Sequence, residues 1–167
     1  MTWNEPINWE EGDRFNANIF NRQIKENQEH LFRTPRAFAM PRDVTPPTDP
    51  NYYIVSSSTL EAVDDTIFKL TLTTTGGQVK VIFSGALHQT VDSSDGIYLN
   101  VFVDDTAYYH SSLLVEGTNA EWEVRSFMLP FDLAAGEHTF SLHWAVGAGL
   151  GYIQGNIMLI TFGAYEL

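Results

Sequence analysis

The chain has 167 residues, of which 44% are hydrophobic and 13% are aromatic, enough to build the core of one domain. Its 21 Asp and Glu residues outnumber its 9 Lys and Arg residues and give a formal net charge of −12, so it would repel nucleic acid and other anionic polymers. It contains no cysteine, which excludes disulfides, thiolate metal sites and cysteine nucleophiles.

Composition divides the chain into three predicted parts. They are an N-terminal helical arm over residues 1–33, a proline-rich linker over 34–50 and a β-domain over 51–167. The first residues lack the basic and apolar segments of a signal peptide, and no stretch reaches the roughly 18 apolar residues of a membrane span. We therefore expect a protein made in a cytoplasm, without membrane insertion.

The arm has the pattern of a short self-associating helix. Asp13 can cap a helix over about 14–32. In this helix Phe20, Ile24 and Leu31 recur at steps of four and seven and form an apolar seam along one face, with Asn27 at the intervening seam position. A helix of this length is marginal alone in water and therefore needs a partner. That partner is either another copy of the arm or the chain's own β-domain.

The rest of the chain predicts a linker followed by strands. Five prolines between Thr34 and Pro50 exclude a regular helix or a central strand and predict an extended connector. From Thr66 onward, apolar and polar residues alternate with period two, which predicts short strands over about 66–73, 79–84, 97–103, 122–128, 138–144 and 156–166.

Turn residues separate these predicted strands. Gly76-Gly77 predicts a tight hairpin that pairs the first two strands, and further turns are predicted at Asp104-Asp105 and at residues 134–137. We therefore predict a mainly β fold, an antiparallel β-sandwich or jelly roll, preceded by a short α-helical arm and a proline-rich linker.

Several predicted strands are apolar on both faces. Tyr98 and Phe102 lie on one side of their strand, and Leu99 and Val101 lie on the other. A single sandwich hides one face of each sheet, so a second apolar face predicts contact with other subunits. Together with the seam of the arm, this favours a homotrimer, although a dimer would also bury these faces.

The sequence carries no signature of catalysis or metal binding. The histidines make no HxH or HExxH spacing, and no GxSxG elbow is present. Asp92-Ser-Ser-Asp-Gly96 lacks the full ligand set of a calcium loop, and the glycine-rich segment 147–155 lacks the GK[ST] of a phosphate loop. Turn chemistry and a strand connection explain these two segments better, so we expect no enzyme activity, no cofactor and no metal.

Tyrosines are the candidate binding residues. A tyrosine at a strand end or in a loop offers a sugar ring an apolar face with a polar tip. The tyrosines predicted to lie in such places are Tyr52, Tyr53, Tyr108, Tyr109 and Tyr152. The alternative is that they pack under loops or at a subunit interface, because interfaces are enriched in tyrosine.

Two motifs at the ends of the chain resemble a known class of proteins. The segment WEEGDRFNANIFN, from Trp9 to Asn21, is similar to the tryptophan, Gly-Asp, alanine and Leu-Asn opening of many bacteriophage tail and fibre proteins. Phe20 replaces the usual leucine and Asn16 the usual threonine. The segments 133–144 and 162–167 resemble the penultimate hairpin and closing strand of trimeric phage head domains.

This resemblance implies a virion component. The arm would attach to other virion proteins, with Trp9 and Phe20 as anchors, and the β-domain would form a trimeric knob similar to tumour-necrosis-factor-like folds. We expect a tail-fibre or receptor-binding knob that contacts a host surface glycan or protein. The alternatives are a capsid decoration or head-spike protein that stabilises the particle, and a cellular carbohydrate-binding module.

The seam makes a direct prediction about assembly. Ile24→Asp places an unpaired charge in the contact between arms, which should cost several kcal/mol of association free energy. Light scattering should therefore show a smaller assembly for this variant than for the parent chain. An unchanged mass would show that the arms do not associate through this seam.

Overall fold

The computed structural model describes residues 36–39, 49, 51–91, 93–108, 113–117, 121–155 and 160–167. The chain divides into two compact units, Met1–Thr34 and Pro35–Leu167. The predicted helical arm, with Trp9, Phe20, Ile24, Asn27 and Leu31, lies outside the described residues. In the described ranges, no helix has the length and hydropathy needed to cross a bilayer.

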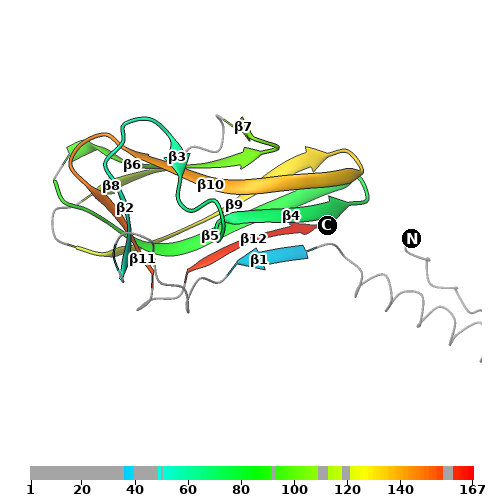
Figure 1. The fold of residues 1–167 in the computed structure, drawn as a ribbon, viewed down its shortest axis with the longest axis horizontal. Helices are drawn as coiled ribbons and strands as arrows, with labels where there is room; N and C mark the ends of the chain where they lie inside the picture. The colour runs from blue at the N-terminus through cyan, green and yellow to red at the C-terminus, as the bar shows by residue number, and fades with distance from the viewer. Residues whose placement is uncertain are drawn as a thin grey trace, which may run out of the picture. The chain divides into compact units, whose positions relative to one another are not determined.

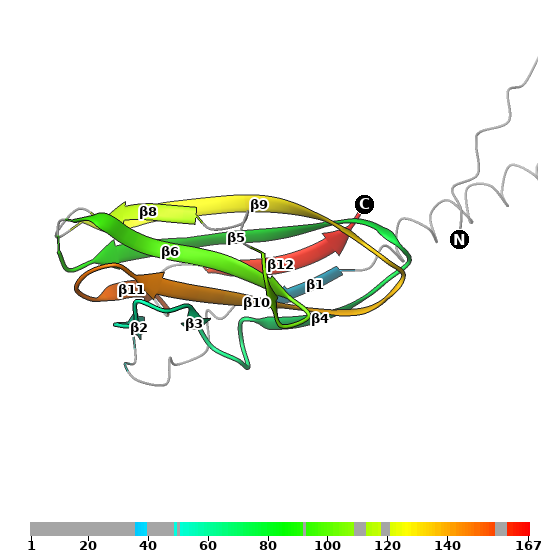
Figure 2. The same ribbon diagram turned by 90° about the horizontal axis from the view of Figure 1, so that it is seen from above.

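The second unit is built from two antiparallel sheets. In sheet A, the long strand β5 pairs with β9 on one side and with β12 and β11 on the other. Strand β12 pairs in turn with β1, and β11 pairs with β2. Figure 2 shows β9, β5, β12 and β1 side by side in this order. The strands are β1 (Arg36–Ala39), β2 (Tyr52–Val55), β5 (Gly77–Gln89), β9 (Glu123–Leu133), β11 (Gly151–Gln154) and β12 (Thr161–Glu166).

Sheet B lies against sheet A, and its strands β6 and β10 are drawn above β5 and β12 in Figure 1. Its centre is the pair β10 and β6; β10 also pairs with β3 and β4, and β6 also pairs with β7 and β8. The strands are β3 (Glu61–Ala62), β4 (Lys69–Thr74), β6 (Ser93–Val103), β7 (Thr106–Ala107), β8 (Leu113–Gly117) and β10 (Gly136–Val146).

The core lies between the two sheets and follows the predicted alternation. On β5 the odd-numbered residues Val79, Val81 and Phe83 are buried, and on β10 the even-numbered residues Phe140, Leu142 and Trp144 are buried. Burying a side chain of this size contributes about 1.5–3 kcal/mol, so this shared face specifies the register of each strand. The prediction of a mainly β protein with antiparallel sheets is confirmed.

The predicted hairpin at Gly76-Gly77 is wrong in its pairing. A turn does occur there, and Gly76 has a φ of 97° that favours glycine. However, β4 pairs with β10 in sheet B, whereas β5 pairs with β9, β11 and β12 in sheet A. The chain crosses between the sheets because Leu70 and Leu72 on β4 and Val79 and Val81 on β5 all bury their side chains in the same core.

A second crossing, from β9 to β10 through residues 134–135, lies beside the first. The Thr74 hydroxyl donates to the Ala134 carbonyl oxygen at 2.7 Å. A Cβ on Gly76 would lie 3.2 Å from the Ala135 nitrogen, so the two corners are in close contact. Glu166 is only 3% exposed and accepts the Thr75 N–H with its two carboxylate oxygens at 2.9 and 3.0 Å, which ties the C-terminal strand to the first corner.

The first predicted strand begins later than its alternation suggested. Asp64 Oδ1 accepts the N–H groups of Thr66 and Ile67 at 2.8 and 2.9 Å, and the Asp64 carbonyl accepts the Phe68 N–H. These bonds stabilise a turn over residues 65–67, so β4 starts at Lys69. Phe68 still enters the core, fully buried.

Residues 36–39 belong to the segment that the prolines predicted to be an extended connector. They are extended, and as β1 they also pair with β12 at the edge of sheet A, from Arg36 opposite Tyr165 to Ala39 opposite Phe162. The segment therefore adds an edge strand to the sandwich. The five prolines of this segment lie outside the described residues.

The predicted turn at Asp104-Asp105 is confirmed and is held by a histidine. Asp104 and Asp105 have φ angles of 51° and 59°, and they join β6 to β7 as a two-residue hairpin turn. His138 Nδ1 lies 2.7 Å from Asp104 Oδ2, and His138 Nε2 lies 3.0 Å from the Ala134 carbonyl oxygen. Only a doubly protonated imidazolium donates to both acceptors, and the hydrogen bond to Asp104 raises the pKa of His138.

We expect this pair to make stability depend on pH. Because the pKa of folded His138 lies above its usual value of about 6.5, protonated His138 stabilises the fold below that pH and loses this effect as pH rises through the raised pKa. Asp104→Asn keeps an oxygen acceptor and tolerates positive φ, but it removes the charge. It should cost about 1 kcal/mol or less, because Asp104 is half-exposed.

The measurement is chemical denaturation of both proteins between about pH 5.5 and pH 9. The difference in unfolding free energy should be largest at the acidic end and should shrink as pH rises. A difference that stays constant across this range would contradict the account of His138.

Candidate functional site

Four aromatic side chains gather on the outer face of sheet A. Three of them each follow or precede a buried core residue on their strand. Because successive side chains on a strand point to opposite faces, these three side chains point away from the core. The buried residues are Tyr53 on β2, Leu87 on β5 and Ile153 on β11. The half-buried outer residues are therefore Tyr52, His88 and Tyr152.

Strand pairing brings these outer residues together. His88 on β5 is directly opposite Tyr152 on β11, and Tyr52 lies on β2, the next strand across. Trp122 immediately precedes β9, whose first residue, Glu123, is opposite Leu87. The four rings thus come from four strands or strand ends that are far apart in the sequence.

The rings form a closed set of contacts that we call the aromatic cluster: Tyr52, His88, Trp122 and Tyr152. Tyr52 stacks on Trp122 with ring centroids 5.4 Å apart and planes at 20°, and it meets Tyr152 edge-on at 5.9 Å. His88 lies 5.2 Å from Trp122 and 5.8 Å from Tyr152. Each ring therefore contacts two others, which restricts its rotamers before any ligand binds.

The aromatic cluster is open to solvent. Its members and Thr90 line a depression of about 310 Å³, and Trp122 is 39% exposed. His88 Nδ1 lies 3.3 Å from the Glu121 carbonyl oxygen, so the histidine also contacts the segment that carries Trp122. The surface combines flat apolar rings with the hydroxyls of two tyrosines and a threonine at its border.

The glycine-rich segment supports one side of this depression. Thr90 and Leu150 exchange hydrogen bonds, with the Thr90 N–H donating to the Leu150 carbonyl and the Leu150 N–H donating to Thr90 Oγ1, both at 3.0 Å. Gly149 has a φ of 69°, and a Cβ there would lie 2.8 Å from Thr90 Oγ1. The glycines thus allow a close turn into β11, in agreement with a strand connection.

Of the tyrosines predicted to bind a ligand, the structure brings Tyr52 and Tyr152 together. Tyr53 faces the opposite way, is 2% exposed and packs edge-on against Phe68; burial and the nearby Asp64 charge raise its pKa to about 12. Its ring is part of the core and offers no surface to a ligand. Tyr108 is exposed but packs on Phe131, and Tyr109 lies outside the described residues.

Sequence reasoning missed two members of the aromatic cluster, His88 and Trp122. His88 lies beyond the predicted strand 79–84. Trp122 belongs to the phase Trp122, Val124, Ser126 and Met128, which the sequence predicts as the apolar pattern of its strand. The structure corrects this, because Val124 and Met128 are 59% and 54% exposed. Continuing the alternation of strand 79–84 could have placed His88 on the outer face, but only strand pairing shows that it meets Trp122.

Another histidine, His143, lies on β10 of sheet B. His143 stacks on Phe102 with ring centroids 3.7 Å apart, and its Nε2 lies 3.1 Å from Ser141 Oγ. Burial lowers its pKa, so its ring is neutral near neutral pH. Within the described ranges, no group of three or more His, Asp or Glu side chains could hold a metal ion.

Comparison with known proteins yields no family. No protein-family model matches the chain, and no curated protein matches it. Among solved structures, it is similar to rabbit GITRL, with 12% identity over 70% of this chain and 93% of that one and a TM-score of 0.40. A structure of infectious bursal disease virus, Gt strain, matches with 10% identity over 80% of this chain and 38% of that one, at a TM-score of 0.43.

A family 35 carbohydrate binding module from an environmental isolate is also similar, with 15% identity over 70% of this chain and 88% of that one and a TM-score of 0.34. At these identities and TM-scores, none of the three likenesses decides between functions. The function is therefore argued below from the chain's own residues.

Proposed function

We propose that this chain is a virion structural protein of tail-fibre or receptor-binding type, whose β-sandwich head binds a host-surface glycan through the aromatic cluster. The single observation that carries the glycan proposal is the closed set of four aromatic rings around an open depression. In this proposal the chain binds without catalysis, needs no cofactor and assembles as a homotrimer through its arm.

The chemistry of the aromatic cluster suits a sugar. One face of a pyranose ring presents C–H groups that stack on an aromatic ring, and its hydroxyls need polar partners at the edge. Trp122 and Tyr52 supply stacked rings, while the Tyr52, Tyr152 and Thr90 hydroxyls can exchange hydrogen bonds with a ligand. Because the rings already hold one another in place, binding a sugar orders few further side chains.

Charge favours a neutral sugar. The chain carries a formal charge of −12, and the five side chains that line the depression include no Lys or Arg. An anionic glycan would meet the repulsion of the whole chain and would find no Lys or Arg to pair with in the depression. We therefore propose neutral hexoses, rather than sialylated or sulfated glycans, as the ligands.

The virion part of the proposal rests on the resemblance of residues 9–21 to phage tail and fibre openings. A cellular carbohydrate-binding module is the second candidate, because the same aromatic cluster supports it. The two differ in assembly: the virion proposal requires a homo-oligomer, whereas the module would have the sedimentation mass of one chain. A capsid decoration protein would instead bind expanded capsids and no glycan.

The test is a glycan array probed with the full chain, followed by titration of the best neutral ligand. Trp122→Ala should weaken binding about tenfold or more, because it removes the most exposed ring of the aromatic cluster. Tyr108→Ala is the matched control, since Tyr108 is 42% exposed, close to the 39% of Trp122, but packs on Phe131 instead. It should bind as the parent does.

Three outcomes would contradict the proposal. The first is an array without neutral hits, and the second is equal loss of affinity in both variants. The third is preferential binding of sialylated glycans, which would reject the charge argument. Adhesion of the full chain to host cells, competed by the neutral ligand, is the corresponding test of the receptor-binding role.

A further inference from the structure

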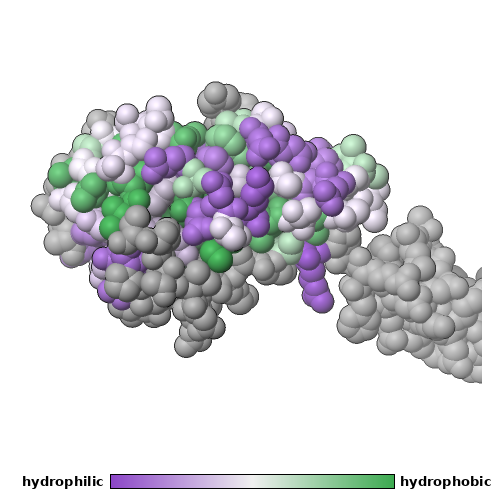
Figure 3. Space-filling view, in the orientation of Figure 1, coloured by the Kyte–Doolittle hydropathy of each residue, from purple (hydrophilic) through white to green (hydrophobic). Residues whose placement is uncertain are grey.

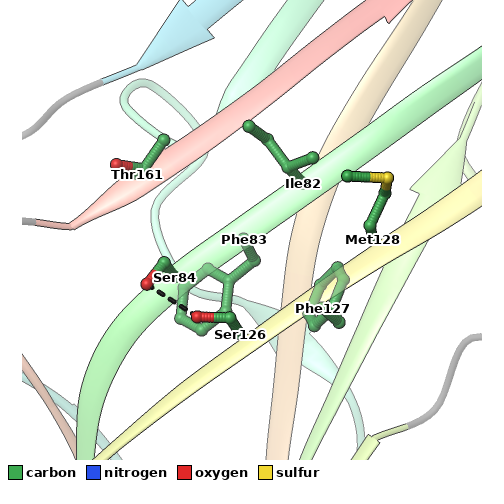
Figure 4. Close-up of a pocket in the computed structure, with 7 residues that line it drawn as sticks. All are labelled: Ile82, Phe83, Ser84, Ser126, Phe127, Met128 and Thr161. Atoms are coloured by element: carbon green, nitrogen blue, oxygen red, sulfur yellow. Dashed lines mark hydrogen bonds between the residues drawn. The ribbon is translucent and has the colours of Figure 1, made fainter.

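A strip of aliphatic side chains continues the outer face of sheet A beyond the aromatic cluster. Val124 and Met128 on β9 are 59% and 54% exposed, and Ile82 on β5 is directly opposite Met128. Figure 4 shows Ile82 and Met128 on neighbouring strands, side by side. Large aliphatic side chains exposed in this way are typical of surfaces that contact protein, since sugars are bound mainly by rings and polar groups.

The two serines within this strip are hydrogen-bonded to each other. Ser126 lies between Val124 and Met128, and its hydroxyl donates to Ser84 Oγ on β5 at 2.8 Å (Figure 4). A partner that covers the strip would therefore not have to accept the Ser126 hydroxyl proton. The strip borders a depression of about 450 Å³, whose lining, which also includes Thr161, contains no charged side chain.

Strand β4 of sheet B has a different outer face. On β4 the outward residues are Lys69, Thr71 and Thr73, all exposed, and Figure 3 shows hydrophilic residues gathered over the region where Figure 1 labels β4 and β10. The exposed aliphatic side chains of β9 thus have no counterpart on β4.

We propose that a second copy of this chain packs on the strip formed by Ile82, Ser84, Val124, Ser126 and Met128. Copies of a chain with a charge of −12 repel one another, so a contact between them requires a surface without charge, and this strip provides one. A partner of opposite charge would gain from a charged surface instead.

The predicted arm supports the same occupant. Residues 1–35 precede β1, and a seam through Ile24 would tether the heads of an assembly to one another. Tethering raises the effective concentration of one head near the next, to about the millimolar range for a short linker. A contact smaller than the roughly 1,200 Å² of a free-standing interface then suffices to hold the heads together.

This proposal depends on the self-association proposed above and identifies the strip as the surface through which the copies contact each other. It also places the glycan site. Trp122, Val124 and Met128 have the same phase along the chain, so a copy on the strip would bring the aromatic cluster to the rim of the contact. The proposed ligand would then bind beside the interface between subunits.

The first experiment measures self-association of the full chain by sedimentation. Met128→Glu should raise the dissociation constant at least about tenfold, equivalent to about 1.4 kcal/mol, because it brings like charges into the contact. Thr73→Glu on β4 adds the same charge to an exposed position of sheet B and should leave the constant unchanged. Circular dichroism confirms that both variants fold.

The second experiment uses the absence of cysteine from the chain. Met128→Cys and Thr73→Cys each introduce a single thiol, whose rate of reaction with a maleimide reports its accessibility. In the assembly, the thiol at position 128 should react more slowly than the thiol at 73, and dilution to the monomer should abolish the difference.

The outcomes separate this inference from the proposed function. An assembly in which both thiols react equally fast, or protection that persists in the monomer, would overturn the strip as the contact. A full chain that is monomeric at every concentration would overturn both the strip and the proposed homotrimer. Glycan binding is measured separately and would survive either result.

Discussion

The burial of one face of sheet A determines what the other face can do. Tyr53, Leu87 and Ile153 enter the core, and this alone turns Tyr52, His88 and Tyr152 outward, where the strand register brings their rings together. A slip of one residue in any of these strands would exchange the two sets and expose core residues at a cost of several kcal/mol. The aromatic cluster is thus held in place by the core behind it.

The aromatic cluster also depends on the two crossings between the sheets. At Gly76 and at Ala134-Ala135 the chain leaves one sheet and enters the other. The Thr74 hydroxyl joins these two corners, and Glu166 ties the first of them to the C-terminal strand. Because β5 and β9 leave their corners in the same sheet, they pair along eleven residues. That pairing places Trp122 next to His88 at one end and forms the aliphatic strip between the aromatic cluster and the corners.

Alternation along the chain predicted the strands well where the residues themselves carry the signal. The phase of His138, Phe140, Leu142 and Trp144 placed the core face of β10, and Asp104-Asp105 predicted its turn correctly. Alternation does not specify a strand's partner, because pairing depends on residues distant in the sequence. For this reason the sequence wrongly predicts that the strands on either side of Gly76-Gly77 pair with each other. It also does not predict the contact of Trp122 with His88. The local turn at Asp64 also outweighed the alternating pattern from Thr66.

The structure of the full chain bound to a neutral host-surface glycan, by crystallography or electron microscopy, tests the central claim most directly. The account predicts a sugar ring in the depression, in contact with Tyr52, Trp122 or Tyr152. A glycan bound elsewhere on the head, with these rings left uncovered, would contradict it.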